Sequence, residues 1–406
     1  MYDVIIIGAR CAGSPTAMLL ARRSFRVLLV DRATFPSDTI STHILWPHGA
    51  EILARWGLLD TLAASGLPPI CRPMTFDVGP FALCGTIPDA NDGRGGFCPR
   101  RTVLDSLLVN AAAESGVEVR ESVSVDELVM AGGTVVGVRG HGKGGTAFEE
   151  RARVIVGADG VSSFVARAAR AAEYDARPVA ACGYYSYFSG VAQDDIELYV
   201  REHCAFGGVP TNDGLHLVMV NWPASQFADV RADIEGHVWR ALELAPDFLG
   251  RVRNGHREAR WHGTAGVPGY FRKPYGKGWA LVGDASYNRD PITAQGISDA
   301  FIDAESLAGA LGTWLSGEGV FEELMEAHEA ARNERVRPMS EFTAHLAALE
   351  PPPPEMQALF AALRHNQEAT DAFLSAITGA IPLPDFMSDE NLGRIMAASR
   401  DAEFHA

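Results

Sequence analysis

The chain has 406 residues and a formal net charge of −16, with 47% hydrophobic and 21% charged residues. These values are typical of a globular protein with two or three domains, and the acidic balance argues against nucleic acid or an anionic membrane surface as the main partner. No apolar run of about 18 residues predicts a membrane span. Because no basic segment precedes the first apolar run, we expect no secretory signal and a cytoplasmic location.

The first 31 residues have the pattern of a dinucleotide-binding βαβ unit. An apolar run at residues 4–7 meets a glycine turn at 8–13, and residues 15–23 are expected to form a helix. A second apolar run at 27–30 ends at Asp31. In such units the helix N-terminus binds the pyrophosphate, and an acid about 20 positions after the first glycine accepts hydrogen bonds from a ribose.

Arg10 stands where the glycine pattern has its middle glycine. A Cβ at this position crowds a pyrophosphate, whereas a guanidinium offers charge and paired donors to phosphate oxygens. We hypothesise that Arg10 swings aside and helps to neutralise the pyrophosphate. The alternative is a solvated surface arginine.

Between this unit and residue 160, helices alternate with short strands and turns. The expected elements are a loop at 35–48, a helix at 49–62, short strands and turns at 66–96, a helix at 102–115, two strands within 117–140 joined at Gly132-Gly133, and a buried strand at 154–156.

From about residue 176 the pattern becomes rich in strands and indicates a second, mostly antiparallel sheet. The expected elements are strands at 184–188, 198–203 and 215–220, turns at Gly207-Gly208 and 212–214, and one helix at 230–245. A second group comprises a buried strand at 279–282, a helix at 297–311, and a largely helical part from 321 onward, interrupted at 351–354.

The cysteines give no sign of a metal site or of a disulfide framework. The six cysteines show no C-x-x-C pair and no zinc spacing, and we expect reduced thiols at positions 11, 71, 84, 98, 182 and 204. His203 and Cys204 are adjacent, but neighbouring side chains of a strand point to opposite faces. We therefore expect no bound metal.

Three segments together carry a resemblance to a known family. They are the N-terminal turn with its acid, the run Gly157-Ala158-Asp159-Gly160, and the run Gly283-Asp284-Ala285 followed by Pro291 and Ala294-Gln295-Gly296. Over residues 1–320 the chain resembles single-component FAD-dependent monooxygenases of the para-hydroxybenzoate hydroxylase type and the related geranylgeranyl-reductase-like oxidoreductases. The resemblance names FAD as the resident dinucleotide and leaves the substrate open.

The expected fold class is α/β, with a Rossmann-like FAD-binding domain, a second, mostly antiparallel β-sheet substrate domain and a helical C-terminal segment. The expected boundaries are residues 1–70, 97–175 and 276–330 for the FAD-binding domain, 71–96 and 176–275 for the substrate domain, and 331–406 for the C-terminal segment. That last segment either covers the pocket or makes a dimer contact, so a monomer and a homodimer both remain open.

Residue chemistry and the resemblance together predict the cofactor contacts. Asp284 can accept bonds from ribityl hydroxyls, and the helix after Gly296 directs its N–H groups at the electron-rich edge of a reduced flavin. For Asp159 and Asp284 the alternative is a turn-forming role. The resemblance adds Arg101, in Arg-x-x-Leu-Asp, with Arg100 as a competing match, and Val125 against the adenine. The full set is Gly8, Arg10, Cys11, Ala12, Gly13, Asp31, Arg32, Arg101, Val125, Asp159, Gly283, Asp284, Pro291, Gly296 and Ile297.

The resemblance also implies a reaction cycle. NAD(P)H reduces bound FAD, O₂ adds at the flavin C4a atom, and the resulting hydroperoxide transfers one oxygen to an electron-rich small molecule. The protein holds the substrate and excludes water, so a catalytic acid or base is not compulsory. No second nucleotide-binding unit is present in the sequence, which agrees with transient binding of NAD(P)H.

The substrate pocket is expected between the flavin and the second sheet. Aromatic candidates for its wall are Tyr185, Tyr187, Phe206 and Trp222, and ordinary packing within the sheet is the alternative for each of them. Alternation places Tyr185 and Tyr187 on one face of their strand. His43 is a candidate for substrate binding or proton transfer, with loop stabilisation as the alternative.

Two rival functions remain open. One is a flavin reductase or dehydrogenase that acts on C=C bonds without oxygen transfer. The other is a non-catalytic flavin-binding accessory protein. A halogenase is less favoured, because the sequence lacks the Trp-x-Trp-x-Ile-Pro segment that halogenases related to this family usually carry.

Overall fold

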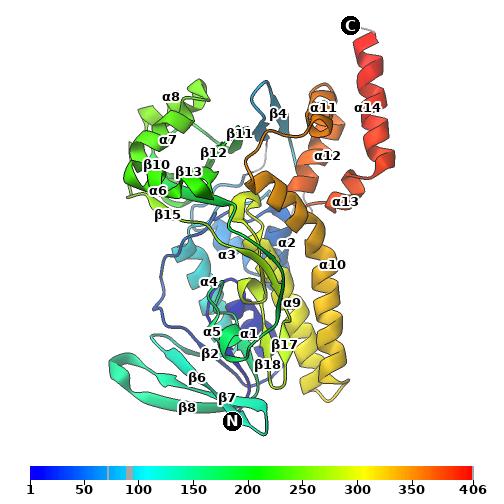
Figure 1. Ribbon diagram of the computed structural model, residues 1–406. Helices are drawn as coiled ribbons and strands as arrows, with labels where there is room; N and C mark the ends of the chain where they lie inside the picture. Colours follow the sequence, from blue (N-terminus) through cyan, green and yellow to red (C-terminus); the bar gives the residue numbers. More distant parts are fainter. Residues whose placement is uncertain (71–72, 88–94, 405–406) are drawn as a thin grey trace.

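The computed structural model describes residues 1–70, 73–87 and 95–404 (Figure 1). The lower part of the molecule in Figure 1 is built around a parallel sheet. Its strands are β17, β18, β8, β1, β2 and β5 in spatial order, and all neighbours from β18 to β5 run parallel. Their bounds are Tyr275–Gly276, Trp279–Leu281, Ala147–Gly157, Tyr2–Ile7, Val27–Val30 and Glu118–Arg120.

Both faces of the parallel sheet are covered, which explains the unbroken apolar runs in its strands. Val4 and Ile6 of β1 pack with α1 (Gly13–Ala21), α4 (Arg101–Glu114) and α9 (Gly296–Leu315). The alternate residues Ile5 and Ile7 face the other layer. That layer consists of the ribbon of β6 (Ser124–Ala131), β7 (Thr134–His141) and the first part of β8, with α5 (Phe164–Ala168).

A second sheet forms the upper part of the molecule and is mostly antiparallel, as predicted (Figure 1). Its spatial order is β14-β10-β13-β12-β11-β3-β4, with β15 also pairing β10, and only β11 and β3 among these described pairs run parallel. The bounds are His256–Arg257, Ala181–Ser189, His216–Pro223, Cys204–Pro210, Ile196–Arg201, Met74–Asp77, Ala82–Gly85 and His262–Thr264.

Helices cover the two faces of this second sheet. One face packs on α6 (Phe227–Ala232), α7 (Ile234–Leu242) and α8 (Pro246–Asn254). The other face packs on the C-terminal helices, whose bounds are Phe321–Ala347 for α10, Pro354–Leu363 for α11, Gln367–Ile377 for α12, Leu383–Phe386 for α13 and Asp389–Phe404 for α14. In Figure 1, α10 runs along one side of the molecule and links the lower part to these helices.

The remaining described elements are short. A three-stranded sheet contains β19 (Tyr287–Asn288), β16 (Gly269–Arg272) and β9 (Glu173–Arg177). Helices α2 (Pro47–Trp56) and α3 (Leu59–Ala63) follow the first βαβ unit, and single 3-10 turns lie at Lys143–Gly145, Asn212–Gly214, Ala224–Gln226, Gly283–Ala285 and Pro291–Thr293.

Four local predictions need correction. Gly207-Gly208 lies inside β12. The chain turns instead between β11 and β12, where His203 has φ 60°. The helix expected at 230–245 is broken at Asp233, whose carboxylate accepts from Gly236 N at 2.9 Å and caps α7. The helix expected at 49–62 ends at Gly57 with φ 78°, and α3 begins after it. Residues 117–140 contain three strands, because β5 precedes the predicted hairpin.

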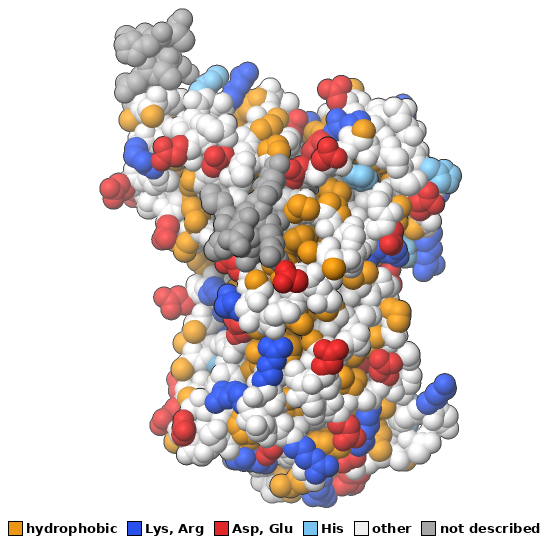
Figure 2. All heavy atoms as spheres, turned by 180° about the vertical axis from the view of Figure 1, so that it is seen from behind, with side chains coloured by type: hydrophobic (Ala, Val, Ile, Leu, Met, Phe, Trp, Pro, Cys, Tyr) orange, Lys and Arg blue, Asp and Glu red, His pale blue; other side chains and the backbone are white. Residues whose placement is uncertain are grey.

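Other features of the described chain bear on the expected partners. No helix in the described ranges is long and apolar enough to cross a membrane. On the face that Figure 2 shows, the described Lys and Arg side chains are interspersed with Asp and Glu and form no continuous basic patch. Within the described residues no group of three or more His, Cys, Asp or Glu side chains is arranged to hold a metal. The five described cysteines are free, and Cys71 lies outside the described residues.

Candidate active site

A cavity of about 870 Å³ lies where the two sheets and the C-terminal helices meet. Four parallel strands point their carboxyl ends at it, because Gly8 follows β1, Asp31 follows β2, Asp159 follows β8 and Gly283 follows β18, and all four residues line the cavity. Ligands of open parallel sheets bind at this edge.

Glycines bring the walls of this edge together. Gly8 has φ 106°, and a Cβ on it would lie 2.3 Å from Ala158 O. A Cβ on Gly13 would lie 1.8 Å from Gly8 O, and one on Gly283 (φ 61°) would lie 2.7 Å from Ala12 Cβ. No described side chain caps the N-terminus of α1. The turn is therefore closely packed on its protein side, while the helix N-terminus stays open to an anion.

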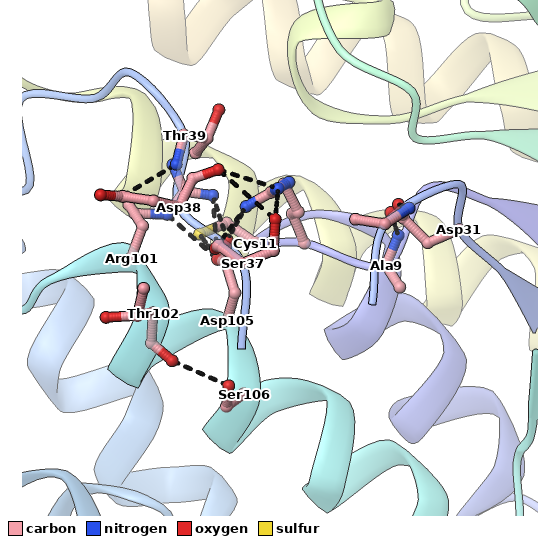
Figure 3. A network of polar contacts seen from close by, with 12 residues as sticks. Ala9, Cys11, Asp31, Ser37, Asp38, Thr39, Arg101, Thr102, Asp105 and Ser106 are labelled. Carbon is pink, nitrogen blue, oxygen red and sulfur yellow. Dashed lines mark hydrogen bonds and ion pairs between the residues drawn. The ribbon is translucent and has the colours of Figure 1, made fainter. Parts of the chain in front are cut away.

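Asp31 holds this turn to the second strand. Its Oδ2 accepts from Ala9 N at 2.7 Å (Figure 3). Its Oδ1 accepts from Ala33 N at 2.7 Å. Each carboxylate oxygen has a further lone pair, so these bonds leave acceptor capacity for a ribose hydroxyl. The neighbouring Arg32 and, on β6, Val125 also line the cavity.

Arg10 is paired with protein groups, and about a quarter of its side chain stays exposed. Its guanidinium forms a 2.5 Å ion pair with Asp105 of α4 and donates to Ser37 and Asp38 of the following loop. Figure 3 shows these three partner residues close together. These contacts show that Arg10 is not a free side chain at the surface. A contact between Arg10 and a pyrophosphate stays a prediction.

Arg101 binds the same carboxylate. It is buried in the first turn of α4, and its Nε and Nη2 lie 3.0 and 2.9 Å from Asp105 Oδ1. Asp105 is fully buried and also accepts a 3.5 Å contact from Cys11 Sγ, whose pKa is raised to about 12 by burial. Two guanidinium groups thus share one carboxylate beside the glycine turn, so these three side chains together carry one net positive charge.

Asp159 has its carboxylate occupied within its own segment. Oδ1 accepts from Ser163 Oγ at 2.5 Å, and Oδ2 accepts from Phe164 N at 2.6 Å and Val165 N at 3.1 Å. These are the bonds of a residue that orders the start of α5. The Gly-Ala-Asp-Gly run still lines the cavity through its backbone, since Ala158 and Gly160 lie in its wall.

Two carboxyl groups in the cavity wall have raised pKa values. Asp284 lines the cavity and is exposed to it, and desolvation within the site raises its pKa to about 6 against the opposing charge of Arg101. Burial likewise raises the pKa of Asp290 to about 6. The Oδ1 of Asp290 accepts from Ile292 N at 3.0 Å, while its buried Oδ2 has no described partner. Asp290 was not predicted, and its position before Pro291 was the available signal.

The segment 291–297 carries Pro291, Gly296 and Ile297 along the cavity wall. Ala294 adopts φ 54°, a left-handed conformation that glycine adopts more easily. Gly296 begins α9, and a Cβ on it would meet no described atom within 4 Å, so the approach to this helix N-terminus is open. Two C-terminal helices hold the segment, through Thr293 Oγ1 to Thr343 Oγ1 at 2.9 Å and Gln295 Nε2 to Ile377 O at 3.2 Å.

His43 is fully buried and lies behind the cavity wall rather than in it. Its Nε2 is 2.9 Å from Tyr187 Oη, and its ring meets the edge of Tyr185 at 5.1 Å between centroids. Burial, with the charge of Arg101, lowers the pKa of His43 to about 3. The imidazole is therefore neutral at physiological pH, and a role of His43 in substrate binding or proton transfer stays a prediction.

The four aromatic residues predicted for the pocket wall occupy different positions relative to the cavity. Tyr185 lines the cavity, and burial raises its pKa to about 12. Tyr187 lies on the same face but packs behind, against His43. Phe206 is among the cavity-lining residues, but its ring stacks on Tyr199 and on Phe248 of α8. Trp222 packs on this same face of the sheet, among α6–α8, and is not part of the cavity lining that the structure describes. For Trp222 the alternative of ordinary packing describes the geometry.

Most of the apolar wall escaped sequence reasoning. These residues come from strands of the second sheet and from α10 and α12, which are distant in sequence, and they are Met74, Phe76, Leu198, Leu217, Met219, Phe342, Leu346 and Ile377. The C-terminal segment thus covers the pocket, one of the two roles expected for it. The periodic spacing of apolar residues in its helices indicates that one face is buried, but it does not indicate which part of the protein covers that face.

Fold and site together define a protein of the FAD-binding oxidoreductase class. Residues 1–343 match the family described as an FAD binding domain, and the chain belongs to it. A digeranylgeranylglycerophospholipid reductase of Methanosarcina mazei is 29% identical over 322 residues, 76% of this chain and 74% of that protein.

Solved structures share the fold over nearly the whole chain. The myxobacterial chondrochloren halogenase CndH has a TM-score of 0.79 at 23% identity and covers 98% of this chain and 96% of that one. The pqsL protein of Pseudomonas aeruginosa, described as a probable FAD-dependent monooxygenase, has a TM-score of 0.69 at 21% identity and covers 92% and 99%.

The residues present fit FAD. The glycine cradle around Gly8, Gly13 and Gly283 leaves room only on its cavity side, and the uncapped start of α1 opens onto that side. The positive corner at Arg10 and Arg101 suits an anionic pyrophosphate, and Asp284 offers an acceptor further along the cavity. The protein is an FAD-dependent oxidoreductase.

Proposed function

We propose that the protein uses NAD(P)H and O₂ to oxygenate an uncharged, largely apolar small molecule, of which aromatic compounds are the best candidates. The observation that carries the proposal is the wall of the cavity beyond segment 291–297. Met74, Leu217, Met219, Phe342 and Ile377 supply apolar surface there. An apolar site of this kind excludes water, and oxygen transfer requires this exclusion because water destroys the reactive intermediate.

The groups near this wall also agree with oxygen transfer. The pKa of Tyr185 is raised to about 12 and that of His43 is lowered to about 3, both mainly by burial, so both side chains are neutral at physiological pH. Oxygen transfer to an electron-rich ring does not require a strong acid at the substrate. FAD, when bound, supplies the electron pair taken from NAD(P)H and the activation of O₂.

The chain's own residues perform the holding and the orientation. Asp31 and the start of α1 are the proposed contacts for the ribose and the pyrophosphate, and Asp284 is the proposed acceptor for the ribityl hydroxyls. Backbone N–H groups at Gly296 and Ile297 lie at the N-terminus of α9, where they stabilise negative charge. Tyr185 offers a hydroxyl that can orient a polar group of the substrate, and His43 positions the two tyrosines from behind.

A second candidate is reduction of a C=C bond. Two observations favour it. A relative that is 29% identical is a digeranylgeranylglycerophospholipid reductase. Asp290, with its pKa near 6 and an oxygen that makes no described hydrogen bond, provides a carboxyl group that can deliver a proton. Such a reaction needs a proton donor besides the hydride, and it does not consume O₂.

Substrate-dependent oxygen uptake separates the two candidates. A panel of phenols, polycyclic aromatics, indoles and prenyl compounds is added to the FAD-loaded protein with NADH or NADPH. The proposal expects nucleotide oxidation and O₂ consumption to rise together with one class of compound. Turnover that continues without O₂, with a product richer by two hydrogens, would overturn it in favour of the reductase. Bound flavin that no compound allows NAD(P)H to reduce would favour the accessory protein.

A further inference from the structure

The loop from Phe35 to His43 forms one wall of the flavin cavity and leads into the buried histidine. Residues 38–42 all line the cavity. Within the described structure, every hydrogen bond that joins residues 37–42 to the chain outside this loop is donated by Arg10: to Ser37 O at 3.3 Å, Ser37 Oγ at 3.0 Å and Asp38 O at 3.3 Å.

Arg10 is in turn fixed by a buried anion. Its Nη1 pairs with Asp105, which is fully buried on α4, at 2.5 Å. Its guanidinium also lies 5.4 Å from the centre of the Phe35 ring, at the start of the loop. The side chain therefore bridges three elements: the glycine turn from which it starts, α4, and the loop.

The number of N–H groups on Arg10 decides whether its side chain can bind the loop and a pyrophosphate at the same time. A guanidinium has five N–H groups, and the bonds to Asp105, Ser37 and Asp38 engage both terminal nitrogens of Arg10. The Nε–H alone remains for a phosphate oxygen. Arg10 cannot turn its terminal nitrogens to a pyrophosphate without releasing the loop.

We propose that Arg10 is a positioning residue that closes the 37–42 loop over the flavin cavity and thereby holds His43 in place. The proposal rests on the assigned FAD site and deepens the proposed function, since a closed loop keeps water from the reacting atoms. It gives the departure from the glycine pattern a purpose: the middle position donates to the loop instead of leaving space for the pyrophosphate.

The structure predicts that the fold tolerates loss of this side chain. Asp105 keeps its two-pronged contact with Arg101, so its buried charge stays paired when Arg10 is replaced. Arg10→Met keeps much of the apolar stem and removes every donor. Arg10→Lys keeps the charge toward Asp105 but lacks the planar fork that reaches several acceptors. Arg394→Gln, at an exposed arginine on α14 that bonds Asn391, is the matched control.

The test is hydrogen exchange of the backbone amides of residues 37–42, with and without FAD. Arg10→Met is expected to speed exchange in this segment about tenfold or more, with Arg10→Lys between it and the wild type, and with unchanged exchange in α1 and α4. Iodide should quench the fluorescence of the bound flavin more strongly in Arg10→Met. Arg394→Gln should match the wild type in both measurements.

Three results would overturn the proposal. One is unchanged exchange at 37–42 in Arg10→Met. Another is faster exchange across the whole domain, which indicates a general structural role. The third is an FAD dissociation constant raised about a hundredfold with an unchanged loop, which assigns Arg10 to the pyrophosphate. None of these measurements uses a substrate, so their failure and a failure of the proposed reaction are separate observations.

Discussion

The Nε2 atom of His43 lies 2.9 Å from the hydroxyl of Tyr187, and both side chains are buried behind the wall of the flavin cavity. Burial lowers the pKa of the histidine to about 3 and raises the pKa of the tyrosine above its usual value, so the two groups meet as neutral partners. His43 is the last residue of the cavity loop and has φ 64°. Because Tyr187 belongs to β10, this bond ties the end of the loop to that strand.

Tyr187→Phe removes the oxygen of this pair and leaves Nε2 of a buried imidazole without a partner. An unsatisfied buried polar group costs about 1–3 kcal/mol, and the free energy of unfolding should fall by that amount. Tyr184→Phe, three positions earlier and on the opposite face of the same strand, is the control, since its hydroxyl makes no hydrogen bond that the structure describes. Urea denaturation of both variants measures the difference. Equal stability of the two variants would show that the pair contributes nothing.

His43 also makes stability depend on pH. Its pKa is lowered in the folded protein, so the unfolded chain binds a proton first as pH falls, and stability is lost below about pH 6.5 and down to about 3. Each pH unit in this window costs up to about 1.4 kcal/mol. Asp284 and Asp290 act in the opposite direction, because their pKa values are raised from 3.8 to about 6 in the folded protein. The unfolded chain loses these protons first as pH rises from about 4 to 6, so the protein loses stability over that range.

The contribution of the histidine is isolated by His43→Gln compared with His345→Gln on the exposed side of α10. Stability is measured by denaturation at several pH values between 7 and 4.5. We expect His43→Gln to lose stability less steeply than the wild type as pH falls, and His345→Gln to follow the wild type. Parallel curves for all three proteins would contradict a neutral, buried His43.

Asp284→Ala tests the assignment of this carboxylate to the ribityl hydroxyls. A hydrogen bond to a charged group is worth about 1.5–3 kcal/mol, which corresponds to an FAD dissociation constant raised roughly tenfold to a hundredfold. Flavin fluorescence titration of the apoprotein measures it, with Asp247→Ala on the exposed start of α8 as control. Unchanged affinity would return Asp284 to the turn-forming alternative.

Gly8→Ala should abolish FAD binding and destabilise the protein. Its φ of 106° strains a residue with a side chain, and the added Cβ would lie 2.3 Å from Ala158 O, a backbone atom that cannot move aside alone. Gly250→Ala, inside α8 with no described atom within 4 Å of the new Cβ, should raise stability by up to about 1 kcal/mol. Thermal denaturation and FAD titration compare them. A Gly8→Ala protein that binds FAD normally would contradict the cradle.

Sequence reasoning predicted those parts of the site that are local in the chain. Strand, turn, helix and acid follow one another within 31 residues, so Gly8, Gly13 and Asp31 could be found from spacing alone. The runs at Asp159 and Asp284 also follow buried strands, and parallel strands bring their ends to one edge of the sheet. The division into domains was read from changes in composition and stays a prediction.

The parts that escaped prediction depend on contacts between distant segments. The link from Arg10 to Asp105 joins residues 95 positions apart, and no period or motif signals it. Trp222 was a candidate for the pocket wall because it is an aromatic residue of the second sheet. Which face of a strand meets a ligand depends on what packs on the other face, and Trp222 packs on α6–α8. Gly207-Gly208 was taken for a turn, although glycine also occurs where strands approach closely: a Cβ on Gly207 would lie 2.3 Å from Glu197 O.

The most direct test of the central claim is the origin of the oxygen in the product. The FAD-loaded protein, NAD(P)H and the compound that stimulates nucleotide oxidation are incubated under ¹⁸O₂ in unlabelled water, and the product is analysed by mass spectrometry. The account predicts a product heavier by one ¹⁸O atom, formed only when O₂ is present. A product that gains two hydrogens and no label, at an equal rate without O₂, would contradict it.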